Sequence, residues 1–222
     1  MREILIADDH PLFRDALRRA VLRALPDAVL RDADSVASLQ TLADSHPDAE
    51  LLLLDLHMPG ARGFSTLAHL RGRHPALPII VVSAHEEPAV MRRAIAHGAA
   101  GYIPKSAPID VIVGAVRSVL DGDIWLPADV ARESGAELPA DEIATAARIS
   151  ELTPQQFRVL SMIAEGMLNK QIAYELSVSE ATIKAHMTAI MRKLGVNNRT
   201  QVALLANHLD VDQDSLPNRA GS

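Results

Sequence analysis

Short, nearly continuous apolar runs alternate with helical patterns over residues 1–121. The runs lie at Glu3–Ala7, Ala28–Arg31, Leu51–Asp55, Ile79–Ser83 and Gly101–Pro104. Such runs are typical of strands that are buried on both faces of a parallel sheet. Between them, segments such as Leu12–Leu25 and Ile109–Leu120 carry apolar residues at helical spacing. Five alternating strand–helix units predict an α/β domain with a five-stranded parallel sheet in the flavodoxin-like order 2-1-3-4-5.

This alternation stops after residue 121. Residues 122–149 are rich in glycine, proline and acidic residues and lack strong periodicity. We interpret them as an interdomain linker, with a helical turn near Asp141–Arg148 and with Trp125 packed against one domain.

Only helix signals remain in residues 150–209. Thr153–Gln156 has the pattern of a capping box, and Gly166 and Gly195 stand where helices should stop. Further N-cap candidates are Asn169, Ser179 and Asn198. We therefore expect a small all-α domain of four helices, followed by a polar, disordered tail at 210–222.

Composition narrows the classes of function. The chain has no cysteine, which excludes disulfides and thiolate chemistry, and no apolar run of membrane-spanning length. We expect a cytoplasmic protein that makes no contact with a membrane. A formal net charge of −6 argues against binding to nucleic acid, but residues 150–209 carry six basic and four acidic side chains, a net charge of +2. The helical domain is thus the part of the chain whose charge is compatible with binding nucleic acid.

Four of the predicted strands end in residues that can do chemistry, namely Asp8 and Asp9, Asp55, Ser83 and Lys105. Functional residues of open α/β sheets gather at the carboxyl ends of the strands. Three carboxylates brought together there repel one another unless a cation neutralises them, and hard oxygen ligands favour Mg²⁺. Asp55 can attack phosphorus as a nucleophile, while Lys105 and Ser83 stabilise the transferred group.

Other carboxylate chemistries fit less well. A glycosidase needs a sugar cleft, and the D-x-D signature of aspartyl-phosphate phosphatases fails because residue 57 is His57. No G-x-G-x-x-G or P-loop pattern follows a strand, so a nucleotide site is not expected. The nine histidines show no metal-ligand spacing, and we expect each of them at the surface. A single acid in this position is more often a surface charge, but the ordered set at four strand ends is hard to dismiss.

Residues 1–121 resemble the receiver domain of bacterial two-component response regulators. The resemblance rests on I-L-I-A-D-D-H, L-L-L-L-D-L-H-M-P-G, V-V-S-A and G-Y-I-P-K. It implies that Asp55 accepts a phosphoryl group from a sensor histidine kinase and that Ser83 and Lys105 bind this group. It also implies that Tyr102 swings inward when the Ser83 hydroxyl moves toward the phosphoryl group. The implied Mg²⁺ ligands are Asp8, Asp9, Asp55 and the backbone carbonyl of His57.

The segment Glu180–Leu194 predicts a helix with two different faces. Its apolar stripe consists of Ile183, Met187, Ile190, Met191 and Leu194. Its opposite, solvent-facing side carries Lys184, Ala185, Thr188 and Arg192. A face of small and basic residues can enter a DNA major groove, although an ordinary amphipathic surface helix is the commoner explanation of such a pattern.

Residues 150–209 resemble the LuxR-type helix-turn-helix domain, with N-K-Q-I-A as the first helix of the motif, L-S-V-S as the turn and T-I-K-A-H as the start of the recognition helix. Together the two domains resemble a NarL/FixJ-type response regulator. Lys184, Ala185 and Thr188 would read bases in promoter DNA. Arg192, on the same side of the helix, is a further DNA-binding candidate. Residues expected to contact DNA from the helix ends and flanks are Lys170, Thr182, His186, Lys193 and Arg199.

The resemblance also implies partners. We expect a homodimer when the chain is phosphorylated, paired through Val202 and Leu205 after Asn198, and RNA polymerase is a further candidate partner. The alternative pairing surface is the receiver, through the Glu87–His97 helix or the last receiver helix.

Two other functional classes stay open at this point. One is a constitutive DNA-binding protein whose receiver serves only for protein contacts, which the intact acid set and Lys105 disfavour. The other is an enzyme with a diffusible product, such as a phosphatase. We expect no such enzyme, because the receiver would catalyse only its own phosphorylation and slow dephosphorylation.

Overall fold

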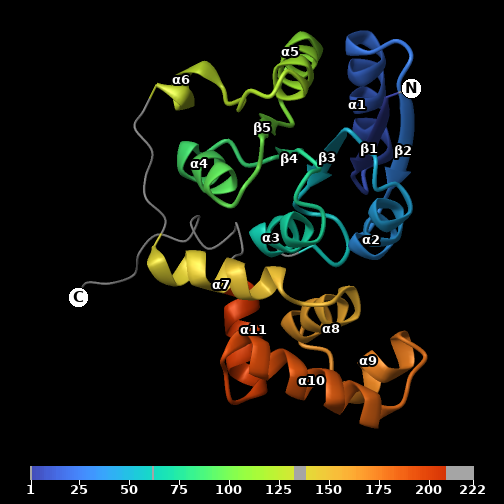
Figure 1. Cartoon of the computed structure of the whole chain (residues 1–222), viewed down its shortest axis with the longest axis vertical. Helices are drawn as coiled ribbons and strands as arrows, with labels where there is room; N and C mark the ends of the chain where they lie inside the picture. Colours follow the sequence, from blue (N-terminus) through green and yellow to red (C-terminus); the bar gives the residue numbers. More distant parts are fainter. Residues whose placement is uncertain (1, 62, 133–138, 209–222) are drawn as a thin grey trace.

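The computed structural model describes residues 2–61, 63–132 and 139–208. An α/β domain with one sheet lies beside a bundle of helices (Figure 1). The tail predicted at 210–222 falls outside the described residues. Among the helices that are described, none combines the length and the apolar character needed to cross a bilayer.

The sheet has five strands, all parallel, in the predicted order β2-β1-β3-β4-β5. The strands are β1 (Glu3–Ala7), β2 (Val29–Ala33), β3 (Leu51–Asp55), β4 (Ile79–Ser83) and β5 (Gly101–Pro104). Only β2 departs from its predicted bounds, Ala28–Arg31. Because Ala7 pairs with Leu54, the carboxyl ends of β1 and β3 lie side by side.

Helices cover both faces of the sheet. The helices of this domain are α1 (Pro11–Ala24), α2 (Val36–Ser45), α3 (Phe64–Arg73), α4 (Pro88–Ala96) and α5 (Ile109–Leu120). Ile6 and Leu53 belong to a buried cluster with α1 and α5, whereas Leu5 and Leu54 belong to the cluster with α2, α3 and α4. Apart from Asp55 and Ser83 at their carboxyl ends, the buried positions of the strands are apolar, because helices cover both faces of the sheet.

The segment after α5 is more ordered than a linker. Trp125 extends the sheet beyond β5, since its carbonyl accepts from Tyr102 N (3.1 Å) and its N–H donates to the carbonyl of Ala100 (3.0 Å). The predicted packing of Trp125 against a domain is therefore confirmed. A short helix, α6 (Ala128–Ala131), follows, and the turn expected near Asp141–Arg148 is a full helix, α7 (Ala140–Ser150).

The helical domain comprises α8 (Pro154–Ala164), α9 (Asn169–Glu175), α10 (Glu180–Leu194) and α11 (Arg199–His208). Side chains of Thr153, Ser179 and Asn198 each accept a hydrogen bond from the backbone N–H three residues later, so these three predicted caps are confirmed. The cap expected at Asn169 is wrong: α9 begins at Asn169, and Leu168 occupies the cap position.

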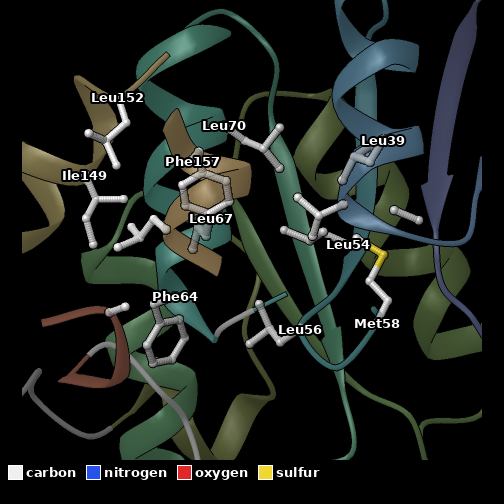
Figure 2. Close-up of a cluster of buried hydrophobic side chains, with 14 of the residues drawn as sticks. Leu39, Leu54, Leu56, Met58, Phe64, Leu67, Leu70, Ile149, Leu152 and Phe157 are labelled. Atoms are coloured by element: carbon white, nitrogen blue, oxygen red, sulfur yellow. The ribbon is translucent and has the colours of Figure 1, made fainter. Parts of the chain in front are cut away.

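The two domains share one apolar core, in which α7 and α8 lie against α3 (Figure 2). The buried side chains that meet there are Phe64, Leu67, Leu70, Ile149, Leu152 and Phe157. The His69 imidazole stacks on the Phe157 ring, with centroids 4.2 Å apart, and burial lowers the pKa of His69 to about 4. His69 and His97 are both buried, so the expectation that every histidine lies at the surface is wrong.

Candidate functional site

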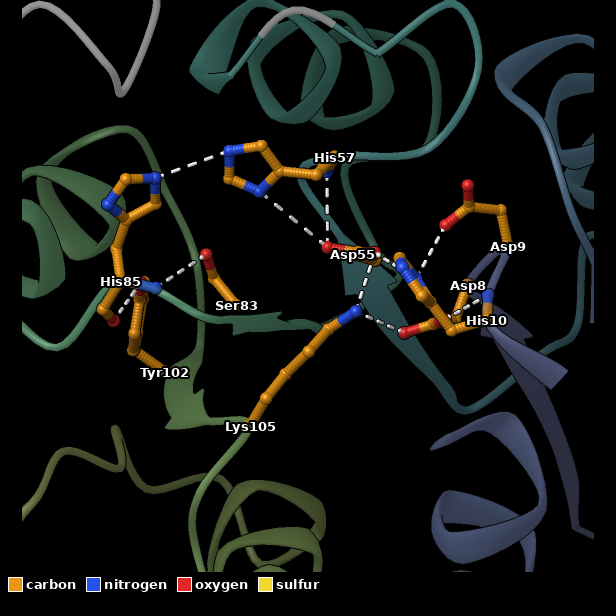
Figure 3. Close-up of polar contacts among 9 residues, drawn as sticks. All are labelled: Asp8, Asp9, His10, Asp55, His57, Ser83, His85, Tyr102 and Lys105. Atoms are coloured by element: carbon orange, nitrogen blue, oxygen red, sulfur yellow. Dashed lines mark hydrogen bonds and ion pairs between the residues drawn. The ribbon is translucent and has the colours of Figure 1, made fainter. Parts of the chain in front are cut away.

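The predicted acid pocket forms at the carboxyl ends of β1, β3 and β5 (Figure 3). Asp8 and Asp55 are buried there, and Lys105 Nζ lies 2.8 Å from Asp8 Oδ2 and 2.7 Å from Asp55 Oδ2. Burial by itself would lower the pKa of Lys105, but hydrogen bonds to Asp55 and Asp8 outweigh it and raise that pKa. The lysine is therefore a fixed ammonium between the two carboxylates.

The pocket also has the donor set of a divalent cation site. Asp8, Asp9, His10 and Asp55 each offer a ligand atom, and these atoms lie within 4.8 Å of one another. Asp8 Oδ2 and Asp9 Oδ1 are buried, and their charged neighbours in the described part of the chain are Lys105 Nζ and His10 Nδ1, each 2.8 Å away. Carboxylate oxygens left in this state suit a hard ion such as Mg²⁺.

The remaining pocket residues come from β4 and β5. Ser83 is buried at the end of β4, and its Oγ accepts from His85 N (3.3 Å). The Tyr102 ring is also buried, and its hydroxyl donates to the carbonyl of His85 (2.8 Å). Burial raises the pKa of Tyr102 to about 12, so the phenol stays protonated. Asp55 Oδ1 in turn accepts from His57 N (3.1 Å). The structure thus brings every predicted residue of this pocket together.

In the helical domain, α10 presents the face that the sequence predicts. Ile183, Met187, Ile190 and Leu194 are buried against the rest of the domain. Lys184, Ala185, Thr188 and Arg192 are exposed, while Thr182 and His186 at the flanks are half-buried. Lys170 on α9 is exposed as well. The predicted orientation of the helix is confirmed, and its basic face is open to solvent.

Two residues expected to contact DNA phosphates already have partners within the chain. Lys193 Nζ donates to the carbonyl of Glu151 (2.7 Å). Arg199 donates to Asn169 Oδ1 (2.9 Å) and to the carbonyl of Met167, which ties α11 to α9. Their contacts with phosphates stay predictions.

The pairing surface expected on α11 needs a correction. Val202 is 0% exposed and belongs to the core of the helical domain, so it cannot reach a second chain while α11 stays folded. Leu205 is half-buried, whereas Leu204 is 63% exposed. The sequence pattern did not separate these neighbours, because residues 202–206 form a continuous apolar run that does not show which side of the helix is buried.

An ion-pair cluster between the domains was not predicted. Glu142 of α7 is only 4% exposed, and its Oε1 lies 2.9 Å from Arg93 Nη2, 3.0 Å from Arg93 Nε and 2.7 Å from His97 Nε2. Burial lowers the pKa of His97, although the hydrogen bond to Glu142 acts in the opposite direction. No signal in the sequence indicated this cluster beyond the helical turn expected near Asp141–Arg148.

Comparisons with known proteins agree with this two-domain arrangement. The family model described as the response regulator receiver domain matches residues 4–117, and that of the bacterial regulatory proteins of the luxR family matches residues 141–206. The glycerol metabolism activator of Pseudomonas putida is 39% identical over 95% of this chain and 97% of its own length. The nitrate/nitrite response regulator protein NarL of Escherichia coli K12 is 33% identical over 90% of this chain and 93% of its own.

The structural likeness extends over both domains. RcsB from Salmonella enterica serovar Typhimurium, solved bound to a promoter in the presence of phosphomimetic BeF3⁻, has 25% sequence identity and a TM-score of 0.53, covering 93% of this chain and 98% of that one. The receiver fold carries the acid pocket, and the LuxR-type domain carries the exposed basic helix. This chain therefore belongs to the NarL/FixJ-type response regulators, the DNA-binding regulators of two-component systems that join a receiver to a LuxR-type helix-turn-helix domain.

Proposed function

We propose that Asp55 is the phosphoacceptor and that a sensor histidine kinase is the donor. The observation that carries this assignment is the Lys105 ammonium, held 2.7 Å from Asp55 and 2.8 Å from Asp8 at the end of the central strands. It supplies a fixed positive charge where the phosphoryl oxygens would arrive. A carboxylate such as that of Asp55 can act as the covalent nucleophile.

In the proposed transfer, an Asp55 oxygen forms a bond to phosphorus while the bond to the leaving group breaks. The leaving group, an imidazole when the donor is a phosphohistidine, departs with the electron pair. The His57 N–H orients Asp55 Oδ1, and Lys105 and the Ser83 hydroxyl bind the oxygens of the phosphoryl group. The product stays attached to the chain, so the receiver catalyses only its own modification and its slow reversal.

The carboxylates that would hold Mg²⁺ are those of Asp8, Asp9 and Asp55, which lie together. The backbone carbonyl of His57 is proposed as the fourth ligand. When bound, the ion neutralises the three carboxylates and stabilises negative charge on the phosphoryl oxygens.

For the output domain we propose that α10 enters the major groove of promoter DNA. Lys184 can donate to guanine O6 and N7, Ala185 can pack on a thymine methyl group, and Thr188 lies on the same exposed face. Arg192 is a further DNA contact on that face. Flanking residues proposed to contact phosphates, which set the register without reading sequence, are Lys170, Thr182, His186, Lys193 and Arg199. RNA polymerase is the partner we propose for the DNA-bound regulator.

The substitution Lys184→Ala should weaken binding to the cognate site by about 1–3 kcal/mol and relax the preference at one base position, because a base-edge contact is lost. Lys170→Ala is the matched control, since Lys170 is exposed but lies on α9, outside the proposed recognition helix. It should weaken binding to all sequences equally and lower the salt slope by about one unit. Selection from randomised DNA measures both effects. If Lys184→Ala selects the same base preferences as the unmodified chain, Lys184 contacts a phosphate and not a base.

Phosphorylation should assemble two chains on one DNA site, because a single helix-turn-helix domain reads few base pairs and pairing doubles the contacts. We assign the pairing to Leu204 and Leu205 of α11. Sedimentation velocity with saturating DNA should show two chains per site for the phosphorylated protein and one for its Leu204→Glu variant.

Val111→Glu tests the alternative surface, because Val111 is an exposed apolar residue of α5. A loss of pairing in this variant alone would place the dimer contact on the receiver. One chain per site in the unmodified sequence would refute pairing on DNA altogether.

A further inference from the structure

Two imidazole rings face each other above Asp55, one from the loop after β3 and the other from the loop after β4 (Figure 3). The Nε2 atom of His57 lies 3.3 Å from the Nε2 atom of His85, and the ring planes are tilted by 34°. The side chains are 35% and 17% exposed, so the pair is half-shielded but open to small solutes. The proposed phosphoryl transfer uses neither ring.

The other nitrogen of each ring faces a carboxylate. His85 Nδ1 lies 3.4 Å from Glu87 Oε2, and His57 Nδ1 lies 3.9 Å from Asp55 Oδ1. A carboxylate on this side favours the tautomer with the proton on Nδ1, as it does in carboxylate–histidine–metal sites. In that tautomer each Nε2 offers a lone pair, so the two nitrogens, which already lie within hydrogen-bond distance of each other, can both coordinate one cation.

We propose that His57 and His85 form a binding site for a divalent transition-metal ion of the Zn²⁺ class, distinct from the carboxylate site for Mg²⁺. Tetrahedral coordination with Zn–N bonds of about 2.0–2.1 Å places two ligating nitrogens about 3.3–3.4 Å apart. The observed separation of the two Nε2 atoms, 3.3 Å, matches this nitrogen–nitrogen distance. Imidazole nitrogen selects such ions over Mg²⁺, which prefers oxygen ligands, and water would complete the coordination.

An ion at this position would join the two loops that border the phosphoacceptor pocket. The backbone of His85 is already held by the Tyr102 hydroxyl (2.8 Å) and by Ser83 Oγ (3.3 Å). Coordination by both imidazoles would fix this loop to the loop that carries His57. The metal site would thus stand at the entrance to Asp55, and its formation does not require Asp55 to be phosphorylated.

The test is Zn²⁺ affinity of the full chain, measured by competition with a chromophoric chelator in excess Mg²⁺, which occupies the carboxylate site. His85→Asn and His57→Asn should each weaken Zn²⁺ binding by at least about tenfold, because each removes a ligand. His74→Asn is the matched control: His74 Nε2 also lies 3.3 Å from a carboxylate, that of Asp44, but no imidazole contact is found for it in the described structure. This variant should retain the affinity of the unmodified chain.

The proposal is overturned if the unmodified chain shows no Zn²⁺ affinity, or if His85→Asn binds Zn²⁺ as tightly as the unmodified chain. In the second case the ion sits elsewhere, for example on His10 and the neighbouring acids. Thermal unfolding without metal shows whether each variant is folded. If His57→Asn is not folded, the Zn²⁺ affinity of His85→Asn alone decides between the outcomes. Nitrogen chemical shifts of the two Nε2 atoms provide an independent readout, since both should move on Zn²⁺ addition while those of His74 should not.

Discussion

Asp55→Asn should abolish labelling of the chain by acetyl phosphate and Mg²⁺, measured by intact mass as the loss of the increment of about 80 Da that a phosphoryl group adds. The amide is a poor nucleophile, and it also removes one of the charges that hold the Lys105 ammonium 2.7 Å away. Asp32→Asn is the control, because this carboxylate lies on β2, separated from Asp55 by β1, and pairs with Arg18. It should be labelled as the unmodified chain is.

Labelling should also depend on the metal ligands. Asp9→Ala removes one carboxylate of the proposed Mg²⁺ site, and it should severely weaken labelling at low Mg²⁺. High Mg²⁺ should restore part of it, since Asp8 and Asp55 remain. Undiminished labelling of Asp55→Asn would show that the phosphoacceptor is a residue other than Asp55.

Glu142→Ala should lower the free energy of unfolding by about 3–5 kcal/mol, the usual loss when one partner of a buried ion pair is removed. The Glu142 carboxylate is the shared acceptor for Arg93 and His97, and its removal leaves a guanidinium with a side chain only 15% exposed. Urea unfolding monitored by circular dichroism and by fluorescence of Trp125, the single tryptophan, measures the loss.

The matched control for this substitution is Asp110→Ala. The ion pair of Asp110 with Arg23 is equally short, 2.8 Å, but its side chains are 76% and 61% exposed. Its loss should cost less than about 1 kcal/mol, because water screens both charges. Equal losses for the two variants would mean that the contact between α7 and α4 adds nothing beyond a surface pair.

Much of the fold followed from local pattern. The strands are short apolar runs because both faces of the sheet are covered, and alternation with helices dictated a parallel sheet with its strand order. Neighbouring strands in that order bring Asp8 and Asp55 to the same edge. The acid pocket was therefore predictable from residues far apart in the sequence, since the carboxyl ends of all strands in a parallel sheet lie at the same edge. The orientation of α10 was predictable for a similar reason, because a helical period fixes which side chains share a face.

Contacts between the domains were decided by tertiary structure alone. Glu142 meets Arg93 and His97 because α7 packs across the receiver, and periodicity describes one helix without saying which surface it packs against. The same holds for His69, which an amphipathic pattern would leave at the surface and which the Phe157 ring covers.

The geometry of the loops could not be predicted from the sequence either. His57 and His85 are 28 positions apart and show no metal-ligand spacing, yet the loops after β3 and β4 bring their Nε2 atoms to 3.3 Å. On α11, Val202 is buried and Leu204 is exposed because the helix packs against α8, and the surface of α8 determines which side of α11 is covered. Sequence by itself determined the elements and the strand-end chemistry, since both depend on backbone periods. Packing of separate elements against one another determined which side chains finally meet.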